Sequence, residues 1–228
     1  MTLALVIVDL DGTLVDSFDD IRDGMAVALA AIGVAPSDAL LALSRRGVSL
    51  ESYYQHALAR DPEAPEERAR FAAFVNAYVD HYQRHQKNAR VYDGVFDTLD
   101  EIRSRWPRLR LAVGTNKRTD LARELAADIG LARYFDLIQG SEEVAKKPDP
   151  ALLHLIARRL ETPIEHALMV GDTGADVLAA QRAGCGAVAV TYGGWPRAEI
   201  ETLRPDRLID DFAELVDIVA GTSVSARG

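Results

Sequence analysis

Short runs of apolar residues recur along the chain, and segments with a helical spacing of apolar positions separate them. The first run covers residues 3–8 (LALVIV) and ends at acidic residues and a glycine. Similar runs follow at 109–115, 134–140, 166–172 and 186–192. A short, unbroken apolar run is typical of a strand buried on both faces of a parallel sheet. The alternation of such runs with helical segments therefore predicts an open α/β sheet.

The stretch from residue 16 to residue 90 interrupts this alternation. It contains no convincing strand, and its apolar spacing predicts several amphipathic helices with turns near 33–36 and 61–65. We therefore expect a helical insert of residues 16–90 after the first strand, and a core built from residues 1–15 and 91–228.

Composition narrows the class of protein and its partners. The 228 residues are 48% hydrophobic and 27% charged, a balance typical of a folded globular domain. A formal net charge of −9 argues against nucleic acid or an anionic membrane surface as a partner. The first apolar run is far shorter than a membrane span, and the single cysteine excludes an internal disulfide. We expect a water-soluble, cytoplasmic protein, either a monomer or a homodimer.

Two carboxylates directly follow the first predicted strand, in the string VDLDGTL. Asp9 and Asp11 lie two residues apart there, and Gly12 and Thr13, which follow them, are candidates for substrate binding. In open α/β sheets ligands bind beyond the carboxyl ends of the strands, which makes this position favourable for chemistry. One carboxylate of such a pair can attack a substrate while the other donates and takes a proton. A solvated Asp-Gly turn is the alternative interpretation.

Hydroxyl, amide and ammonium groups follow the next predicted strands. Thr115 and Asn116 come directly after an apolar run, where they can hold a phosphate oxygen. Lys147 precedes Pro148 at an expected helix start. The chain has only four lysines among 26 basic residues, yet three of them lie in these segments: Lys117, Lys146 and Lys147. A compact ammonium group can contact a carboxylate and a phosphoryl oxygen together.

A second pair of carboxylates follows the run at 166–172. Asp172 ends that run, and Asp176 lies four residues later on a helix expected to stop near Gly184. Capping of the helix N-terminus is a purely structural interpretation of Asp176. For Asp172, at a strand end beside Asp9 in a parallel sheet, Mg²⁺ ligation is favoured because that ion prefers hard oxygen ligands.

Taken together, DLDGT, the run ending in Thr115, Lys147-Pro148 and GDTGAD resemble the four motifs of the haloacid dehalogenase-like hydrolases, in order and at compatible spacing. The resemblance implies a Rossmann-like core, and the insert looks like the helical C1-type cap of the phosphoglycolate phosphatase-like branch. It also implies roles for the motif residues: Asp9 as nucleophile, Asp11 as general acid and base, Thr115 and Lys147 as phosphoryl-binding groups, and Mg²⁺ held by Asp9, the Asp11 carbonyl and Asp172, with Asp176 orienting the metal site.

The resemblance therefore implies a magnesium-dependent phosphatase that acts on a small phosphorylated metabolite, such as phosphoglycolate or a sugar phosphate, through an aspartyl-phosphate. Alternatives from the same superfamily are a phosphomutase of the β-phosphoglucomutase type, a pyrophosphatase and a nucleotidase. A non-catalytic regulatory binding protein is an alternative from a different class.

The insert contributes one candidate pair for substrate binding. Arg45 and Arg46 precede Gly47 at an expected break between helices. An arginine fork matches a carboxylate, so we expect this pair to contact the part of the substrate that remains after phosphate leaves. Two solvated surface arginines are the alternative.

Overall fold

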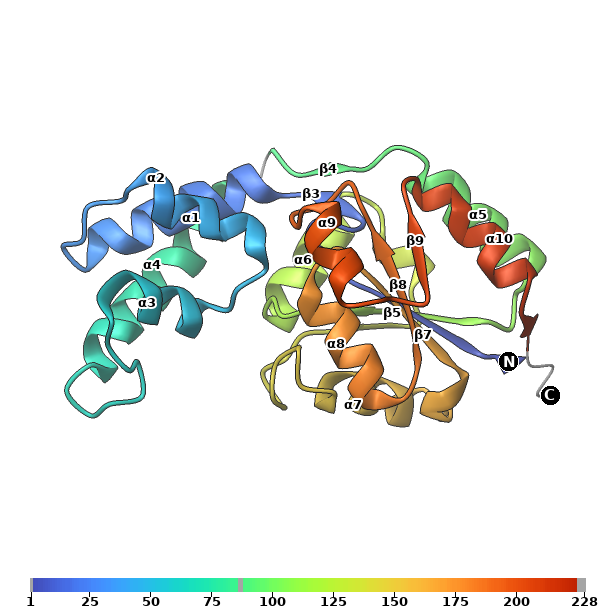
Figure 1. Ribbon diagram of the computed structural model, residues 1–228. Helices are drawn as coiled ribbons and strands as arrows, with labels where there is room; N and C mark the ends of the chain where they lie inside the picture. The colour runs from blue at the N-terminus through green and yellow to red at the C-terminus, as the bar shows by residue number, and fades with distance from the viewer. Residues whose placement is uncertain (1, 86–87, 225–228) are drawn as a thin grey trace. The chain divides into compact units, whose positions relative to one another are not determined.

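The protein folds into two compact units. The computed structural model describes residues 2–85 and 88–224. The first unit combines Met1–Asp16 with Val91–Gly228, and the second is Ser17–Arg90. The chain leaves the first unit through β3 (Val15–Asp16) and returns through β4 (Arg90–Val91), and these two short strands pair with each other (Figure 1).

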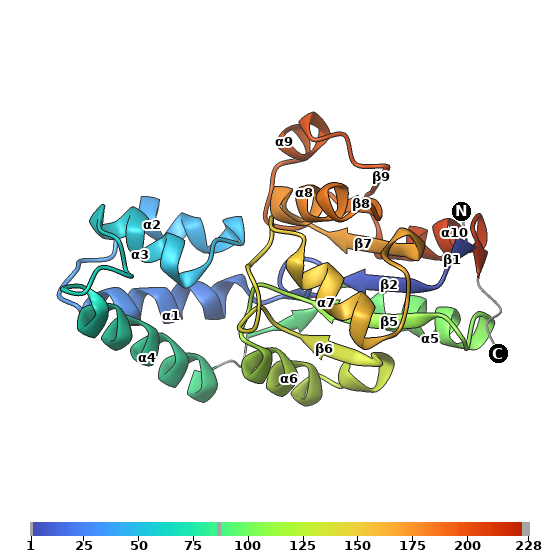
Figure 2. The same ribbon diagram turned by 90° about the horizontal axis from the view of Figure 1, so that it is seen from below.

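The first unit is built on a six-stranded parallel sheet, which confirms the predicted α/β class with a Rossmann-like core. The strand order is β6-β5-β2-β7-β8-β9, and Figure 2 shows the first four side by side. The strands are β2 (Leu5–Val8), β5 (Arg110–Gly114), β6 (Leu137–Gln139), β7 (Ala167–Gly171), β8 (Gly186–Val190) and β9 (Arg207–Ile209). In the centre, Val8 pairs with Val113 on one side and Val170 on the other. Three strands therefore end together around Asp9.

Helices cover both faces of this sheet (Figure 1). Their bounds are α5 (Val95–Arg105), α6 (Thr119–Asp128), α7 (Ala151–Arg159), α8 (Gly174–Ala183), α9 (Arg197–Thr202) and α10 (Leu215–Ala220), with short 3₁₀ turns at Ala132–Tyr134, Ile164–His166 and Phe212–Glu214. Successive side chains of a strand point to opposite faces. Leu5, Ile7 and Met169 accordingly share a buried cluster with Ile156 of α7 and Val177 of α8.

The second unit is helical, with no strand among its described residues before Arg90. It consists of α1 (Phe18–Ala31), α2 (Asp38–Ala42), a 3₁₀ turn (Leu43–Arg46), α3 (Leu50–Leu58) and α4 (Arg68–His85). Its core is aromatic: Tyr54 meets the ring of Phe74 edge-on. The buried carboxylate of Asp20 accepts hydrogen bonds from Asn88 and from the Ala89 backbone N–H, so it joins the start of α1 to the returning chain.

At three places the observed strands differ from those that the apolar runs predict. The run at 134–140 begins in a 3₁₀ turn, and only Leu137–Gln139 is strand. Strand β9 has a single buried residue, Ile209, so its apolar signal is weak. Strand β1 (Thr2–Leu3) pairs with β10 (Ser223–Val224), because main-chain pairing does not require an apolar run. Among the described helices, none has the length and apolar character needed to cross a lipid bilayer.

Candidate active site

Asp9 lies where the central strand of the sheet ends. Its backbone N–H donates to Val170 O at 2.9 Å, which continues the pairing of β2 with β7 one residue past the strand. The N–H of Leu10 donates to Asp9 Oδ1 at 2.8 Å. The residue is only 8% exposed. A buried carboxylate is thus fixed by the backbone at the edge where parallel sheets bind ligands.

Three carboxylates converge at this edge. Asp9, Asp172 and Asp176 each offer an oxygen within 4.8 Å of the others, and all three residues are buried. Asp172 directly follows β7, the neighbour of β2 in the sheet, and Asp176 lies in the first turn of α8. The structure therefore brings together three acidic residues singled out in the sequence: Asp9 and Asp172 at strand ends, and Asp176 on the adjoining helix.

Lys147 provides positive charge within this cluster. Its ammonium Nζ lies 3.1 Å from Asp9 Oδ1 and 2.6 Å from Asp176 Oδ1, and it donates to Gly114 O at 2.7 Å. The side chain of Asn116 holds the backbone of Lys147. Its Nδ2 donates to Lys147 O at 2.9 Å, and its Oδ1 accepts from Lys147 N at 2.8 Å. Asn116 thus positions the lysine as well as lying at the strand end.

Asp172 is held by the segments that surround it. Thr13 Oγ1 donates to Asp172 Oδ1 at 3.2 Å, and Gly194 N donates to Oδ2 at 2.7 Å. Gly12 has a φ of +84°, and a Cβ there would lie 2.2 Å from Asp172 Oδ2. A Cβ on Gly193 would lie 2.2 Å from Asp172 Cβ. Glycine is required at both positions for the two loops to approach this carboxylate.

Asp176 is bound by donors on both of its oxygens. Thr173 donates to Oδ2 from its hydroxyl at 2.7 Å and from its backbone N–H at 3.0 Å, while Lys147 contacts Oδ1. The same side chain therefore closes the start of α8 and contacts the buried lysine. The role predicted for Asp176 in orienting the metal site stays a prediction. This arrangement suits a residue that orients its neighbours.

The cluster carries more negative charge than Lys147 offsets. Burial raises the pKa of Asp9 from its ordinary 3.8 to about 6; the Lys147 ammonium opposes this, and the carboxylates of Asp176 and Asp11 add to it. Burial, then Asp176 and Asp9, raise the pKa of Asp172 well above its ordinary value. The pKa of Lys147 is raised, because Asp176 and Asp9 outweigh the lowering effect of burial. The site is thus poised to gain from an additional cation.

The donor set fits Mg²⁺. That ion prefers carboxylate and carbonyl oxygens, and it relieves the charge that ionised carboxylates impose on one another. Asp9 and Asp172 combine buried carboxylates with raised pKa values. The carboxylate of Asp11 is not one of these three, and the Asp11 carbonyl that the resemblance assigns to Mg²⁺ stays a prediction.

Asp11 is paired with a lysine of the neighbouring strand end. Lys117 Nζ lies 2.9 and 2.8 Å from the two oxygens of the Asp11 carboxylate, and its side chain is 5% exposed. Its backbone N–H donates to Thr115 Oγ1 at 3.2 Å. Thr115 is 2% exposed, and its own N–H donates to Gln139 O. The strand end after β5 therefore presents a threonine and a lysine to the same edge as Asp9.

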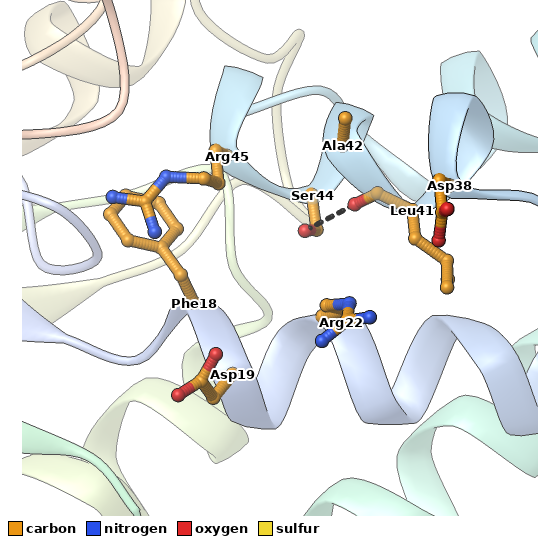
Figure 3. A pocket seen from close by; sticks show the side chains of 8 residues that line it. All are labelled: Phe18, Asp19, Arg22, Asp38, Leu41, Ala42, Ser44 and Arg45. Carbon is orange, nitrogen blue, oxygen red and sulfur yellow. Dashed lines mark hydrogen bonds between the residues drawn. The ribbon is translucent and has the colours of Figure 1, made fainter.

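Arg45 and Arg46 lie in the second unit, in the 3₁₀ turn that ends at Gly47 with a φ of +64°. The Arg45 guanidinium stacks over the ring of Phe18, 4.3 Å from its centroid (Figure 3). Arg45 and Phe18 border a cavity of about 250 Å³. The other residues that line it are Asp19, Arg22, Asp38, Leu41, Ala42 and Ser44. A cation-π contact of this kind favours one orientation of the Arg45 side chain. The role predicted for Arg45 and Arg46 stays a prediction.

Sequence reasoning missed three contributors. The pairing of Lys117 with Asp11 was not expected, although its place after an apolar run was a usable signal. Thr173 lies inside the quoted string GDTGAD, where a hydroxyl three residues before an acid indicates a helix cap. Gly194 carried no signal beyond the glycine pair itself, and its backbone N–H contacts Asp172 only through the folding of the loop after β8.

Comparison with known proteins agrees with this arrangement. The family model described as haloacid dehalogenase-like hydrolase matches residues 6–190. A phosphoglycolate phosphatase of Agrobacterium fabrum is 35% identical over 215 residues, which cover 92% of this chain and 90% of the relative. The phosphoglycolate phosphatase of Chromobacterium violaceum is also 35% identical, covering 92% of this chain and 94% of the relative.

Solved structures share the fold. The crystal structure of a predicted phosphoglycolate phosphatase from Haemophilus somnus 129pt superimposes with a TM-score of 0.81 at 28% identity. The match covers 96% of this chain and 98% of the other. The similarity therefore extends over both units and is not limited to the parallel sheet.

Proposed function

The chain belongs to the family of haloacid dehalogenase-like hydrolases, and we propose that it is a Mg²⁺-dependent phosphatase that hydrolyses a small phosphate monoester through an aspartyl-phosphate on Asp9. The observation that carries the proposal is the placement of Asp9: a buried carboxylate at the end of the central strand, with Lys147 on one oxygen and two further carboxylates beside it. The relatives named phosphoglycolate phosphatase support phosphoglycolate as the first substrate to test.

The proposed first step is attack of an Asp9 oxygen on phosphorus. Lys147 would contact a phosphoryl oxygen while keeping its contact with Asp9, and Thr115 would donate to another oxygen, so charge on the transferring group is stabilised. Asp9, Asp172 and the Asp11 carbonyl would hold Mg²⁺, which reduces the repulsion between the anionic phosphate and the nucleophilic carboxylate. Gly12 and Thr13 would place the loop that carries these groups, because Gly12 lies against Asp172 and the Thr13 hydroxyl donates to it.

The proposed second role belongs to Asp11. Its carboxyl group would give a proton to the leaving oxygen and then take one from the water that hydrolyses the aspartyl-phosphate. Asp176 would keep Lys147 in place, since it binds the ammonium at 2.6 Å and is itself held by Thr173. Asn116 would serve the same purpose through the lysine backbone.

A turnover assay tests this function. Purified protein with Mg²⁺ should release inorganic phosphate from phosphoglycolate, and Asp9→Asn should leave the circular dichroism spectrum intact while reducing kcat by more than about a hundredfold, since an amide is not a usable nucleophile. An Asp9→Asn variant that kept a larger fraction of kcat would refute the covalent mechanism. Isomerised sugar phosphate without free phosphate would indicate the phosphomutase alternative, and inactivity on every phosphate ester would favour a regulatory role. The cytoplasmic location stays a prediction that cell fractionation can test.

A further inference from the structure

The buried ion pair between Lys117 and Asp11 has no role in the steps proposed so far. Both ammonium–carboxylate distances are below 3.0 Å, so the pair is bidentate. The Lys117 side chain is 5% exposed and that of Asp11 is 16% exposed. An ammonium group that has lost most of its water is strongly destabilised without an anionic partner. Turning Asp11 away from Lys117 gives up this bidentate ion pair, and that loss is offset when another anion takes the place of the Asp11 carboxylate.

The backbone that carries Lys117 is tightly fixed. A Cβ on Gly140 would lie 2.3 Å from Lys117 O and 2.5 Å from Thr119 N, so β6 and this loop approach each other as closely as a glycine permits. Gly140 N donates to Thr119 Oγ1 at 2.8 Å, and Lys117 N donates to Thr115 Oγ1. The fixed backbone anchors the Lys117 side chain at this strand end, and its flexible stem lets the ammonium reach a neighbouring anion.

The chemistry of an α-carboxylated phosphate ester matches this arrangement. In phosphoglycolate one methylene group separates the ester oxygen from the carboxylate. The proposed function requires Asp11 to contact that ester oxygen when the leaving group departs. A carboxylate attached one carbon away then lies beside Asp11, within reach of the group that already binds the Asp11 carboxylate.

We propose that Lys117 is the binding site for the carboxylate of the leaving group, and that the substrate carboxylate replaces Asp11 on Lys117, which frees Asp11 to turn to the ester oxygen. This inference rests on the proposed phosphatase function and deepens it, because it names the residue that recognises the carboxylate of a leaving group such as that of phosphoglycolate. An ester with a neutral tail offers no anion for the exchange, so its binding leaves the pair of Lys117 and Asp11 intact.

Binding of stable analogues tests the proposal without turnover. 3-Phosphonopropionate has the shape and charges of phosphoglycolate, and propylphosphonate lacks the carboxylate. Titration calorimetry on the Mg²⁺-loaded enzyme should show that Lys117→Met weakens 3-phosphonopropionate at least tenfold, about 1.4 kcal/mol, and changes propylphosphonate less than about threefold. Lys146→Met, which removes the same charge from the loop between β6 and α7, should change neither ligand by more than that. Equal losses for both ligands in Lys117→Met would overturn the proposal.

Turnover provides a second readout. The ratio of kcat/KM for phosphoglycolate to that for p-nitrophenyl phosphate should fall at least tenfold in Lys117→Met, and Lys117→Arg should restore part of it because the cation is retained. A merely structural role for Lys117 would lower both rates together and leave the ratio unchanged.

A structure of the wild-type complex decides the matter if Lys117→Met does not fold. With 3-phosphonopropionate bound, the distance from Lys117 Nζ to the ligand carboxylate should be that of an ion pair, below about 3.2 Å. A ligand carboxylate bound elsewhere, with Lys117 still on Asp11, would refute the exchange. Absence of phosphatase activity would refute the proposed function alone, since ligand binding tests Lys117 independently.

Discussion

Replacing the proposed nucleophile should make the metal-free protein more stable. The carboxyl of Asp9 has a pKa of about 6 in the folded chain against its ordinary 3.8, chiefly because of burial. The folded state therefore holds this proton more tightly than the unfolded state does, so the stability of the metal-free protein falls as pH rises from about 4 to about 6. At 1.4 kcal/mol per pH unit, ionising Asp9 in the folded protein costs about 3 kcal/mol by neutral pH.

The change Asp9→Asn removes this cost and keeps the shape of the side chain. We expect a gain of roughly 1–3 kcal/mol at pH 7.5, because the buried amide still loses some hydration, and a gain below about 1 kcal/mol at pH 4.5. For a chain of this length that corresponds to roughly 3–10 °C in melting temperature. Calorimetry in EDTA at both pH values measures it.

A neighbouring carboxylate provides the control with the opposite sign. Asp11→Asn removes a carboxylate that contacts the buried Lys117 ammonium, so this variant should melt below the wild type at pH 7.5. Mg²⁺ should raise the melting temperature of the wild type more than that of Asp9→Asn, since the variant lacks a charged ligand. A melting temperature of Asp9→Asn at or below that of the wild type in EDTA, or a gain that does not grow with pH, would refute the reasoning.

Three further changes test other parts of the site. EDTA should abolish turnover and Mg²⁺ should restore it, whereas Ca²⁺ should not, because its longer bonds and looser geometry suit the donor set less well; full activity in excess EDTA would contradict the metal assignment. Thr173→Val removes the hydroxyl that donates to the Asp176 carboxylate and should lower the unfolding free energy by about 1.5–3 kcal/mol in urea titrations, with an unchanged value counting against that bond. Arg45→Ala tests whether a second cation besides Lys117 contacts the leaving-group carboxylate: kcat/KM should then fall at least tenfold for the natural substrate but hardly at all for p-nitrophenyl phosphate, and equal effects would leave Arg45 as surface of the second unit.

The fold could be predicted because it follows from local patterns. Unbroken apolar runs mark strands buried on both faces, and those at 3–8, 109–115, 166–172 and 186–192 all contain strands of the central sheet. The strand boundaries were predicted less accurately than the strands themselves. Strand β6 is shorter than its run, because the first residues of that run form a 3₁₀ turn whose backbone bonds stay local. Apolar side chains indicate burial there but do not distinguish a strand from a buried turn.

The convergence of the acidic residues was also predictable, for a topological reason. Parallel strands end at the same edge, so a carboxylate after β2 and another after β7 must lie close together once those strands are neighbours. Of the two glycines that permit this approach, Gly12 was marked by the string DLDGT, whereas Gly193 had no sequence signal of its own. A Cβ at Gly193 would collide with Asp172, but the two residues belong to different loops, and only the folded chain brings them within contact.

The sequence did not predict which residue pairs with Asp11. The sequence does not say whether Lys117, which follows β5, contacts Asp9, Asp11 or a ligand. All of these lie at one edge of the sheet, and a lysine side chain spans several ångströms. The structure distinguishes them: Lys147 binds Asp9 and Asp176, while Lys117 binds Asp11. In the proposed mechanism Lys147 faces the phosphoryl group and Lys117 faces the leaving group. A carboxylate on the leaving group would then have a cation of its own, which a shared lysine would not provide, and we propose this division as the physical basis for distinguishing α-carboxylated esters from neutral ones.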